Sequence, residues 1–108
     1  MTETTELVRR YYAALDGHDY DELRTLLAAE FVQVRPDRRF DDREAFVRFM
    51  RDERPNADTT HELLAVVGDD DQVAVRGRVD ADGEMLFAFA DFFTVRDGHL
   101  VRLETYSR

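Results

Sequence analysis

Cysteine and lysine are both missing from this chain of 108 residues. The absence of cysteine excludes disulfides, thiol catalysis and thiolate metal ligands. No apolar run approaches the roughly 20 residues that a membrane-spanning helix needs, and no cationic leader precedes an apolar stretch. We therefore expect a soluble, unprocessed, cytoplasmic protein that has no membrane partner.

Basic charge is also scarce: 24 acidic residues stand against 15 basic ones, all of them arginine, and the net charge is −9. A field this negative repels nucleic acids and anionic membranes, so we exclude both as partners. An acidic surface without lysine is typical of proteins from salt-loving archaea, in which high salt screens the self-repulsion. A GC-rich genome that favours arginine codons is the alternative, and of the two we favour the halophilic explanation.

Motifs for several kinds of chemistry are missing too. There is no glycine-rich phosphate loop and no nucleophile elbow. The histidines and acidic residues show no spacing typical of a metal site, and the GDDD run at 68–71 indicates a solvated turn. We therefore expect neither a metal nor a cofactor.

The hydrophobic period of the sequence changes in its middle. In the first half, apolar residues at helical spacing predict helices at about 7–15, 19–27 (with Asp19 as its N-cap) and from 42 onward, and a short strand at 31–34. In the second half, alternation predicts strands at 60–67, 72–81, 84–96 and 99–107. The pairs Asp82-Gly83 and Asp97-Gly98 are typical of tight hairpin turns. Three helices followed by a meander of long strands predict one α+β domain over 1–108.

Two segments carry a resemblance to a known superfamily. RRYYAALDGHDYDELRTLLAAEFV at 9–32 combines a helix, a Gly-x-Asp turn, a second helix and a strand, and DFFTVRDGHLVRLETY at 91–106 combines a strand acid, aromatics, an Asp-Gly turn and a closing strand. In this order they resemble the NTF2-like superfamily, and within it the SnoaL-like and ketosteroid-isomerase-like proteins. The resemblance implies a cone: a curved, mainly antiparallel sheet wrapped by three N-terminal helices and enclosing an apolar pocket. It implies no single activity, because this fold serves enzymes, binding proteins and transport factors.

The resemblance also implies roles for three positions. Tyr11 falls where ketosteroid isomerases keep a tyrosine of the oxyanion hole, and Asp91 falls where they keep a protonated aspartic acid. Their catalytic base belongs just before the proline that follows the first strand, and here that position is Arg35. Arginine is not a base near neutral pH, so we do not expect the steroid-isomerase reaction.

Strand alternation predicts what surrounds Asp91 if it points into the cone. Arg35 and His61 are the further polar candidates for ligand binding, although Arg35 is equally explained as a rim arginine, and His61 and Tyr11 as structural residues. The remaining lining is expected to be aromatic and aliphatic, which suits a small apolar molecule. Its members are Met85, Phe87, Phe89, Phe93, Val75, Val101 and Leu103.

A carboxylate inside the apolar run at 85–95 has two explanations. As a site acid, Asp91 is free of Arg35 and burial raises its pKa. As a structural group, it stays ionised and pairs with Arg35. The first explanation points to a SnoaL-like enzyme of isomerase, cyclase or hydrolyase type, in which Asp91 transfers a proton and Tyr11 polarises an oxygen of a small carbonyl or hydroxyl compound. The alternative function is a ligand-binding or accessory domain without turnover.

The opposite face of the same strand carries Leu86, Ala90 and Phe92. Such an apolar patch is costly to leave in water, and members of this superfamily commonly pair sheet to sheet. We expect a homodimer through this face, with Phe92 near its centre.

Overall fold

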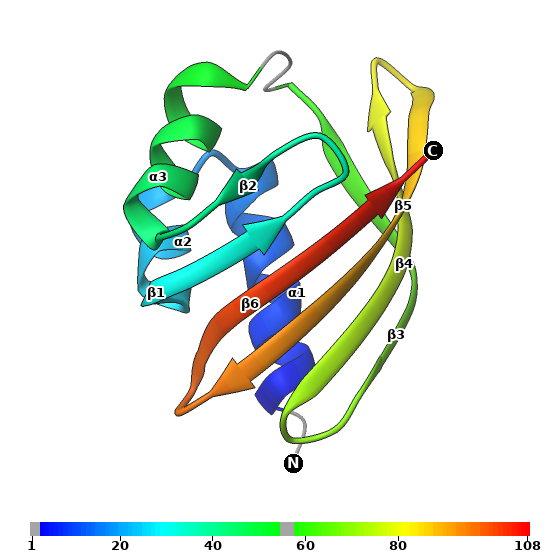
Figure 1. Ribbon diagram of the computed structural model, residues 1–108. Helices are drawn as coiled ribbons and strands as arrows, with labels where there is room; N and C mark the ends of the chain where they lie inside the picture. The colour runs from blue at the N-terminus through cyan, green and yellow to red at the C-terminus, as the bar shows by residue number, and fades with distance from the viewer. Residues whose placement is uncertain (1–2, 55–57) are drawn as a thin grey trace.

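Six strands form one curved sheet in the order β2-β1-β6-β5-β4-β3 in the computed structural model, which describes residues 3–54 and 58–108 (Figure 1). Neighbouring strands are antiparallel, except that β1 and β6 run parallel. In chain order the described elements are α1 (Glu3–Asp16), α2 (Tyr20–Leu26), β1 (Leu27–Val34), β2 (Arg39–Phe40), α3 (Arg43–Arg48), the π-helical turn η1 (Phe49–Glu53), β3 (Thr60–Gly68), β4 (Gln72–Ala81), β5 (Glu84–Arg96) and β6 (His99–Ser107). The predicted α+β class is confirmed.

The helices begin and end where local chemistry directs them. Asp19 caps α2 by accepting a hydrogen bond from the Glu22 amide, which confirms the predicted cap, and Asp42 caps α3 in the same way through the Ala45 amide. α1 ends at Asp16, and the left-handed residue of the turn that follows is His18, with φ of 57°. None of the described helices is long and apolar enough to cross a membrane.

Two boundaries differ from the prediction. Leu27, predicted in the second helix, already belongs to β1, because pairing with Leu100 of the parallel strand β6 buries its side chain. The strand therefore starts four residues before Phe31, and tertiary pairing overrides the helical apolar spacing. The third helix widens into η1, where the Arg54 amide donates to the Phe49 carbonyl. The two-residue strand β2 was not predicted.

Both predicted hairpin turns are confirmed. Asp82 and Gly83 have φ of 53° and 79°, and Asp97 and Gly98 have φ of 53° and 77°. Two successive positive φ values define the turn type whose twist matches the flanking strands. These turns connect β4 to β5 and β5 to β6, so they fix which residues of β5 face the helices.

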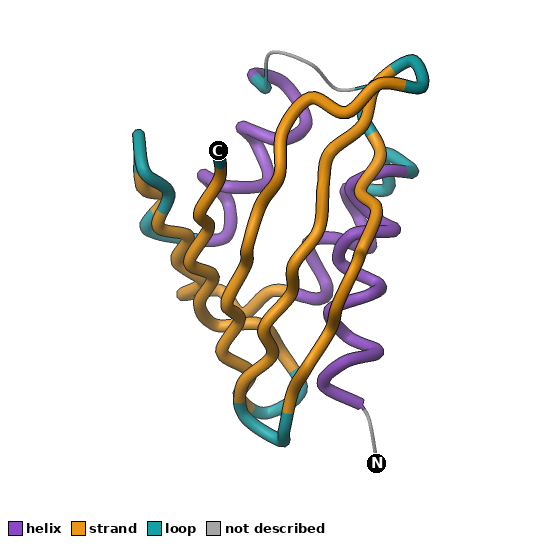
Figure 2. The backbone as a smooth tube through the Cα atoms, turned by 90° about the vertical axis from the view of Figure 1, so that its right-hand side faces the viewer, coloured by secondary structure: helices purple, strands orange, loops and turns teal. Residues whose placement is uncertain are grey.

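The helices lie together on one side of the sheet (Figures 1 and 2). α1 contacts β3 and β4, and α3 contacts β1. The core lies between these layers, where Val8, Leu23, Phe31 and Phe46 are fully buried. Each side chain on the helix-facing side of β5 is therefore positioned against α1 or the cavity beside it.

Two β-bulges shift the predicted alternation. Between the pairs Val79–Phe87 and Asp80–Met85, Leu86 is the extra residue of β5, so it lines the cavity described below and Met85 is 57% exposed. In β6, Val101 is the extra residue, and Leu100 takes the buried position predicted for it. The predictions for Met85 and Val101 were therefore wrong, and Leu86 does not belong to the outer patch.

Gly77 lies where β4 passes closest to its neighbours. A Cβ atom at this position would lie 2.5 Å from the Glu62 carbonyl oxygen and 2.8 Å from the Phe89 ring. We expect Gly77→Ala to lower the free energy of unfolding by about 1–3 kcal/mol, because strand β3 and the ring must both move. Urea denaturation measures the change. A loss below about 0.5 kcal/mol, the range of neutral surface changes, would contradict the close approach.

The outer face of the sheet exposes apolar side chains of β5 and β6. Phe92 is 49% exposed and its ring packs edge-on against Tyr106, with centroids 5.9 Å apart. Arg102 and Glu104 lie beside this pair and form an ion pair with each other, so the two charges are already paired within the chain. The dimer through this face stays a prediction.

Phe92→Glu tests that dimer. We expect light scattering at tens of micromolar to report a dimer for the original chain and a monomer for the variant, because two buried carboxylates would face each other. Met85→Glu is the matched control, since Met85 is equally exposed but lies near the β4–β5 hairpin. A monomeric original chain, or a dimeric Phe92→Glu variant, would contradict the prediction.

Candidate functional site

A cavity of about 300 Å³ lies between α1, η1 and the helix-facing side of the sheet. The start of β5 and the end of β6 form its mouth through Leu86, Phe87 and Ser107. Apolar atoms make up most of its wall, and its polar residues converge from different elements. The polar residues are Tyr11, Tyr12, Gln33, Arg35, Arg54, Thr59, His61, Asp91, Thr105 and Ser107.

Asp91 is held in this cavity by Tyr12. The residue is 5% exposed, and its Oδ2 accepts a hydrogen bond of 2.5 Å from the Tyr12 hydroxyl. Its other oxygen, Oδ1, is buried and accepts no hydrogen bond from any described residue. Thr105 lies directly opposite on β6, and its hydroxyl is close enough to lower the pKa of Asp91 as a hydrogen-bonding group, although it does not satisfy Oδ1 in this geometry. Asp91 Oδ2 is therefore hydrogen-bonded to Tyr12, and Oδ1 has no hydrogen-bond partner within the described chain.

Burial raises the pKa of Asp91 above its usual value, because the ionised carboxyl loses its hydration. The hydrogen bond from Tyr12, the nearby Thr105, His61 and Arg35 act in the opposite direction but do not outweigh burial. Burial also raises the pKa of Tyr11 and Tyr12, and the neighbouring Asp91 carboxyl adds to both shifts. Both phenols therefore remain protonated hydrogen-bond donors.

The tyrosine bonded to Asp91 is not the one that the sequence indicated. Tyr11 lines the same cavity, but its ring packs against Phe93 and Phe46, with centroids 5.3 and 6.3 Å away. Tyr12 was predicted only as part of the apolar face of α1. Its role could not be inferred from spacing, because both tyrosines lie on the buried side of the helix.

His61 and Asp16 form a second polar pair. The Nδ1 atom of His61 lies 2.6 Å from Asp16 Oδ1, and the His61 amide donates to Asp16 Oδ2 at 2.9 Å. Both Asp16 oxygens are thus used to fix one residue, so we assign the ring proton to Nδ1. The ring lies beside Tyr12 and Phe89, at centroid distances of 5.1 and 5.6 Å. The remaining nitrogen, Nε2, is the one available to a ligand, and Asp16 was missed because it precedes His61 by 45 residues.

Arg35 does not pair with Asp91. Its ion-pair partner is the exposed Asp37, with 3.8 Å between Arg35 Nε and Asp37 Oδ1. Within the described chain, Arg35 and Asp91 form no salt bridge, and Arg35 is only the weakest of the influences on the pKa of Asp91. These observations favour the first explanation of Asp91, an acid free of Arg35.

The structure brings most predicted site residues to one place. Asp91, Tyr11, Arg35, His61, Phe87 and Phe89 line the cavity together. Phe93, Val75 and Leu103 face the same side of the sheet but do not line the cavity, because they are buried in the core between the sheet and the helices. Residues missed by the sequence analysis are Tyr12, Asp16, Gln33 and Arg54.

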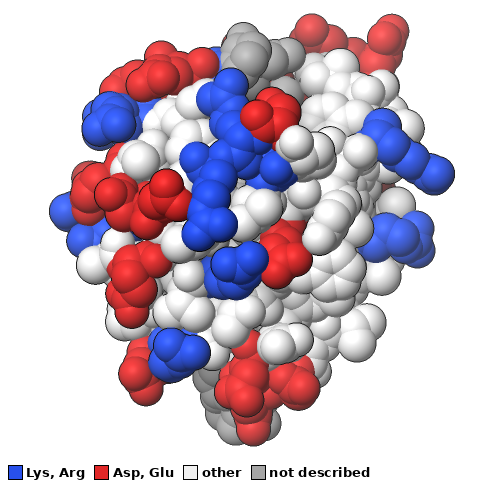
Figure 3. All heavy atoms as spheres, viewed as in Figure 1, with Lys and Arg blue, Asp and Glu red and all other residues white. Residues whose placement is uncertain are grey.

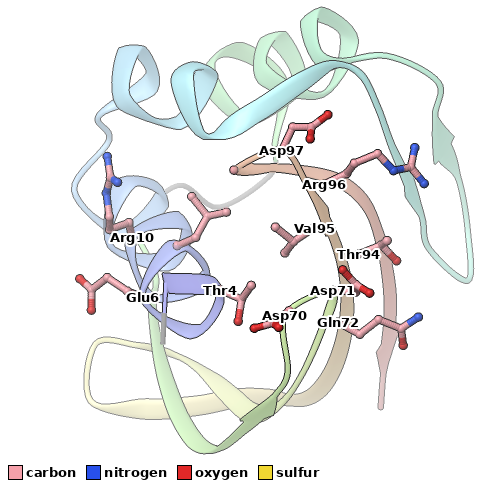
Figure 4. A pocket seen from close by; sticks show the side chains of 12 residues that line it. Thr4, Glu6, Arg10, Asp70, Asp71, Gln72, Thr94, Val95, Arg96 and Asp97 are labelled. Atoms are coloured by element: carbon pink, nitrogen blue, oxygen red, sulfur yellow. The ribbon is translucent and has the colours of Figure 1, made fainter. Parts of the chain in front are cut away.

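A larger hollow of about 960 Å³ lies at the other end of the molecule, between the start of α1 and the turns at 69–71 and 97–98. Figure 4 shows the acidic side chains of Asp70, Asp71 and Asp97 around it, with Val95 pointing inward and Arg96 away. It is wide and polar, whereas small-molecule sites are mostly apolar. Among the described residues, no group of three or more His, Cys, Asp or Glu could hold a metal ion, here or elsewhere.

A curved sheet, helices on one side of it and a cavity with an inner-strand acid define an NTF2-like protein. The family model described as SnoaL-like domain matches residues 8–103. The chain therefore belongs to the SnoaL-like domain family, as its sequence resemblance predicted. The comparison with curated proteins finds no match for this chain.

Several solved structures share the fold. A Kribbella flavida protein provisionally named a ketosteroid isomerase has a TM-score of 0.88 and 24% identity, covering 98% of this chain and 78% of that one. A Sinorhizobium meliloti protein provisionally named a polyketide cyclase has a TM-score of 0.80 and 26% identity, covering 93% of each chain. An LEH-like epoxide hydrolase of M. tuberculosis has a TM-score of 0.82 and 18% identity, covering 99% and 84%. These names differ, so the similarity establishes the fold and not an activity.

Proposed function

We propose that this protein is an acid–base enzyme that moves a proton within a small carbonyl or hydroxyl compound. The supporting observation is that one cavity holds two different titratable groups. Asp91 is a carboxyl group whose burial favours its protonated form, and His61 is a histidine whose ring is oriented by Asp16. A proton donor and a proton acceptor on one wall are what general acid–base catalysis requires.

In the proposed reaction, His61 Nε2 removes a proton from the carbon next to the substrate carbonyl. The electron pair of that C–H bond forms a C=C bond, and the carbonyl π electrons move onto oxygen. Asp91 donates a proton to this oxygen, and Tyr11 donates a hydrogen bond to it. In a substrate with a C=C bond beside the deprotonated carbon, His61 returns the proton to the far carbon of that bond, the C=C bond shifts into conjugation with the carbonyl, and the enol proton goes back to Asp91 as the C=O bond re-forms; this completes an isomerisation.

The apolar wall supports this chemistry in a second way. Leu15, Val79 and Phe89 are buried around the polar groups, and a bound ligand would displace the water between them. Removing water strengthens each hydrogen bond to the developing oxyanion, because the local dielectric falls. The proposed reaction therefore depends on the enclosed apolar pocket that the family resemblance implied.

Hydrogen–deuterium exchange tests the proposal with simple ketones in place of the natural substrate. The protein is incubated in D2O with small aryl-alkyl ketones such as phenylacetone, and ¹H NMR follows the loss of the proton next to the carbonyl. We expect saturable exchange well above the rate in the same buffer without protein. Ketones that shift the protein's NMR signals saturably but never exchange would instead support a ligand-binding domain without turnover.

A further inference from the structure

The cavity contains more buried polar groups than its own residues satisfy. Six buried side-chain nitrogen or oxygen atoms have no hydrogen-bond partner among the described residues. Two of them, Arg78 Nε and Asp80 Oδ1, lie 3.4 Å apart as an ion pair. The other four belong to residues that line the cavity: Gln33, Arg35, Arg54 and Asp91. Unsatisfied buried polar atoms are rare, so their concentration at one cavity points to a ligand.

Two of these four residues are arginines that approach the cavity from different elements. Arg54 follows η1, and its terminal nitrogen donates to the Leu15 carbonyl and to the Tyr20 hydroxyl, which fixes the guanidinium in place. No described carboxylate forms a salt bridge with Arg54, and its Nε is buried without a partner. Its positive charge is thus held at the cavity wall without a counter-charge.

Arg35 reaches the cavity from the end of β1. Its side chain is 28% exposed and its guanidinium lies 5.9 Å from the centre of the Phe49 ring. Its Nε lies 3.8 Å from Oδ1 of the exposed Asp37, which is too far for a hydrogen bond, so this ion pair leaves the Nε–H without a hydrogen-bond acceptor among the residues that the structure describes. Both arginines line the same cavity as Tyr11, and their charges partly offset the rise in the Tyr11 pKa that burial causes. Figure 3 shows basic side chains gathered over β2 and the turn before it, on a face whose top and bottom edges carry acidic side chains.

We infer that the ligand is a small apolar acid whose single carboxylate is held by Arg35 and Arg54. The inference rests on the proposed function for the other end of the ligand, where a carbonyl group meets Asp91, Tyr11 and His61. A planar guanidinium donates paired hydrogen bonds that match a carboxylate. The net charge of −9 repels anions at long range, so an anionic ligand needs such local cations. The substrate class is therefore a small oxo acid with an apolar body, and not a neutral steroid-like ketone.

A matched pair of probes tests this inference by binding alone. Calorimetry or NMR titration compares 3-phenylpropionate with 3-phenylpropionamide, which has the same shape and no charge. We expect the original chain to bind the acid at least tenfold more tightly than the amide. Equal affinities for the two probes, or no binding of either at millimolar concentration, would overturn the inference.

Arginine variants test which residues cause the preference for the acid over the amide. Arg35→Met and Arg54→Met are each expected to reduce the acid-to-amide ratio by tenfold or more, whereas Arg38→Met, which removes the same charge from an arginine outside the lining, should leave the ratio unchanged. Arg54→Met also removes contacts to α1 and α2, so its fold is checked by circular dichroism, and Arg35→Met provides the independent result. An acid preference that all three variants retain would show that other groups hold the carboxylate.

The outcomes separate this inference from the proposed function. Tight binding of the acid with no exchange of any ketone would refute the enzyme and keep the carboxylate site. Exchange of neutral ketones with no preference for acids would keep the enzyme and refute the carboxylate site.

Discussion

Asp91→Asn is expected to lower the catalysed exchange rate by about 10²–10⁴-fold, the usual contribution of a general acid or base. An amide has the shape of the carboxyl group and still accepts the hydrogen bond from Tyr12, but it has no acidic proton for the developing oxyanion. The NMR exchange assay measures the loss, and binding of the probe should change far less. An unchanged exchange rate would remove Asp91 from the mechanism.

The same variant is expected to be more stable than the original chain at alkaline pH. The pKa of Asp91 is raised in the folded state, so the folded chain binds this proton more tightly than the unfolded chain does. That stabilisation is complete below the ordinary pKa of 3.8 and is lost as the pH rises through the folded-state pKa. Asparagine carries no charge to desolvate, so at pH 8 we expect it to gain about 1–2 kcal/mol in urea denaturation.

Tyr12→Phe is the matched control for the stability effect. It removes the hydrogen bond that stabilises the ionised carboxyl, so its cost should be larger at pH 8 than at pH 4 by about 1–1.5 kcal/mol, the usual difference between a hydrogen bond to a charged group and one to a neutral group. If Asp91→Asn instead destabilises the protein at pH 8, and Arg35→Met then restores stability, Asp91 is an ionised structural partner of Arg35.

His61→Gln is expected to lower the catalysed exchange rate by about 10²–10⁴-fold, as Asp91→Asn does. Glutamine can still donate a hydrogen bond to Asp16 and fill part of the ring's space, but its amide is not a base. Probe affinity should therefore persist while the turnover rate falls. Full exchange in this variant would mean that another group removes the proton.

Asp16→Asn separates orientation from proton transfer. The amide no longer favours the tautomer with the proton on Nδ1, so fewer molecules present a free Nε2 to the ligand. We expect a loss of up to about 10⁴-fold, as when the aspartate that fixes the tautomer of a catalytic histidine is replaced by asparagine. An unchanged exchange rate in a well-folded variant would show that the tautomer set by Asp16 is not needed.

The parts of the fold that were predicted correctly are those with a long and regular pattern. Strands β4, β5 and β6 alternate over nine or more residues and are separated by Asp-Gly turns, so local sequence determines them. Leu27 was misplaced because its burial depends on β6, which lies about 70 residues further along the chain. Leu86 and Val101 were misplaced because a bulge changes which face each side chain takes, and no residue type marks either bulge.

In the candidate site too, the residues that local sequence marks were predicted and those that depend on distant contacts were missed. Asp91 was identified because a carboxylate within an apolar strand is costly and therefore conspicuous. Tyr12 was missed because adjacent helical residues point about 100° apart, and the rotation of α1 against β5 decides which hydroxyl reaches Asp91. Asp16 and Arg54 were missed because each contacts the site only through packing between distant elements.

The mouth of the cavity differs from its floor in a way that bears on how such proteins diverge. Leu86 at the mouth belongs to a bulge, whereas Asp91 and Tyr12 belong to a regular strand and a regular helix. A bulge re-aims one side chain locally. Substitutions at the entrance can therefore change which ligand fits while Asp91 and Tyr12 keep their positions. Such a separation gives natural selection, or a protein engineer, a direct route to the different activities named for proteins of this fold.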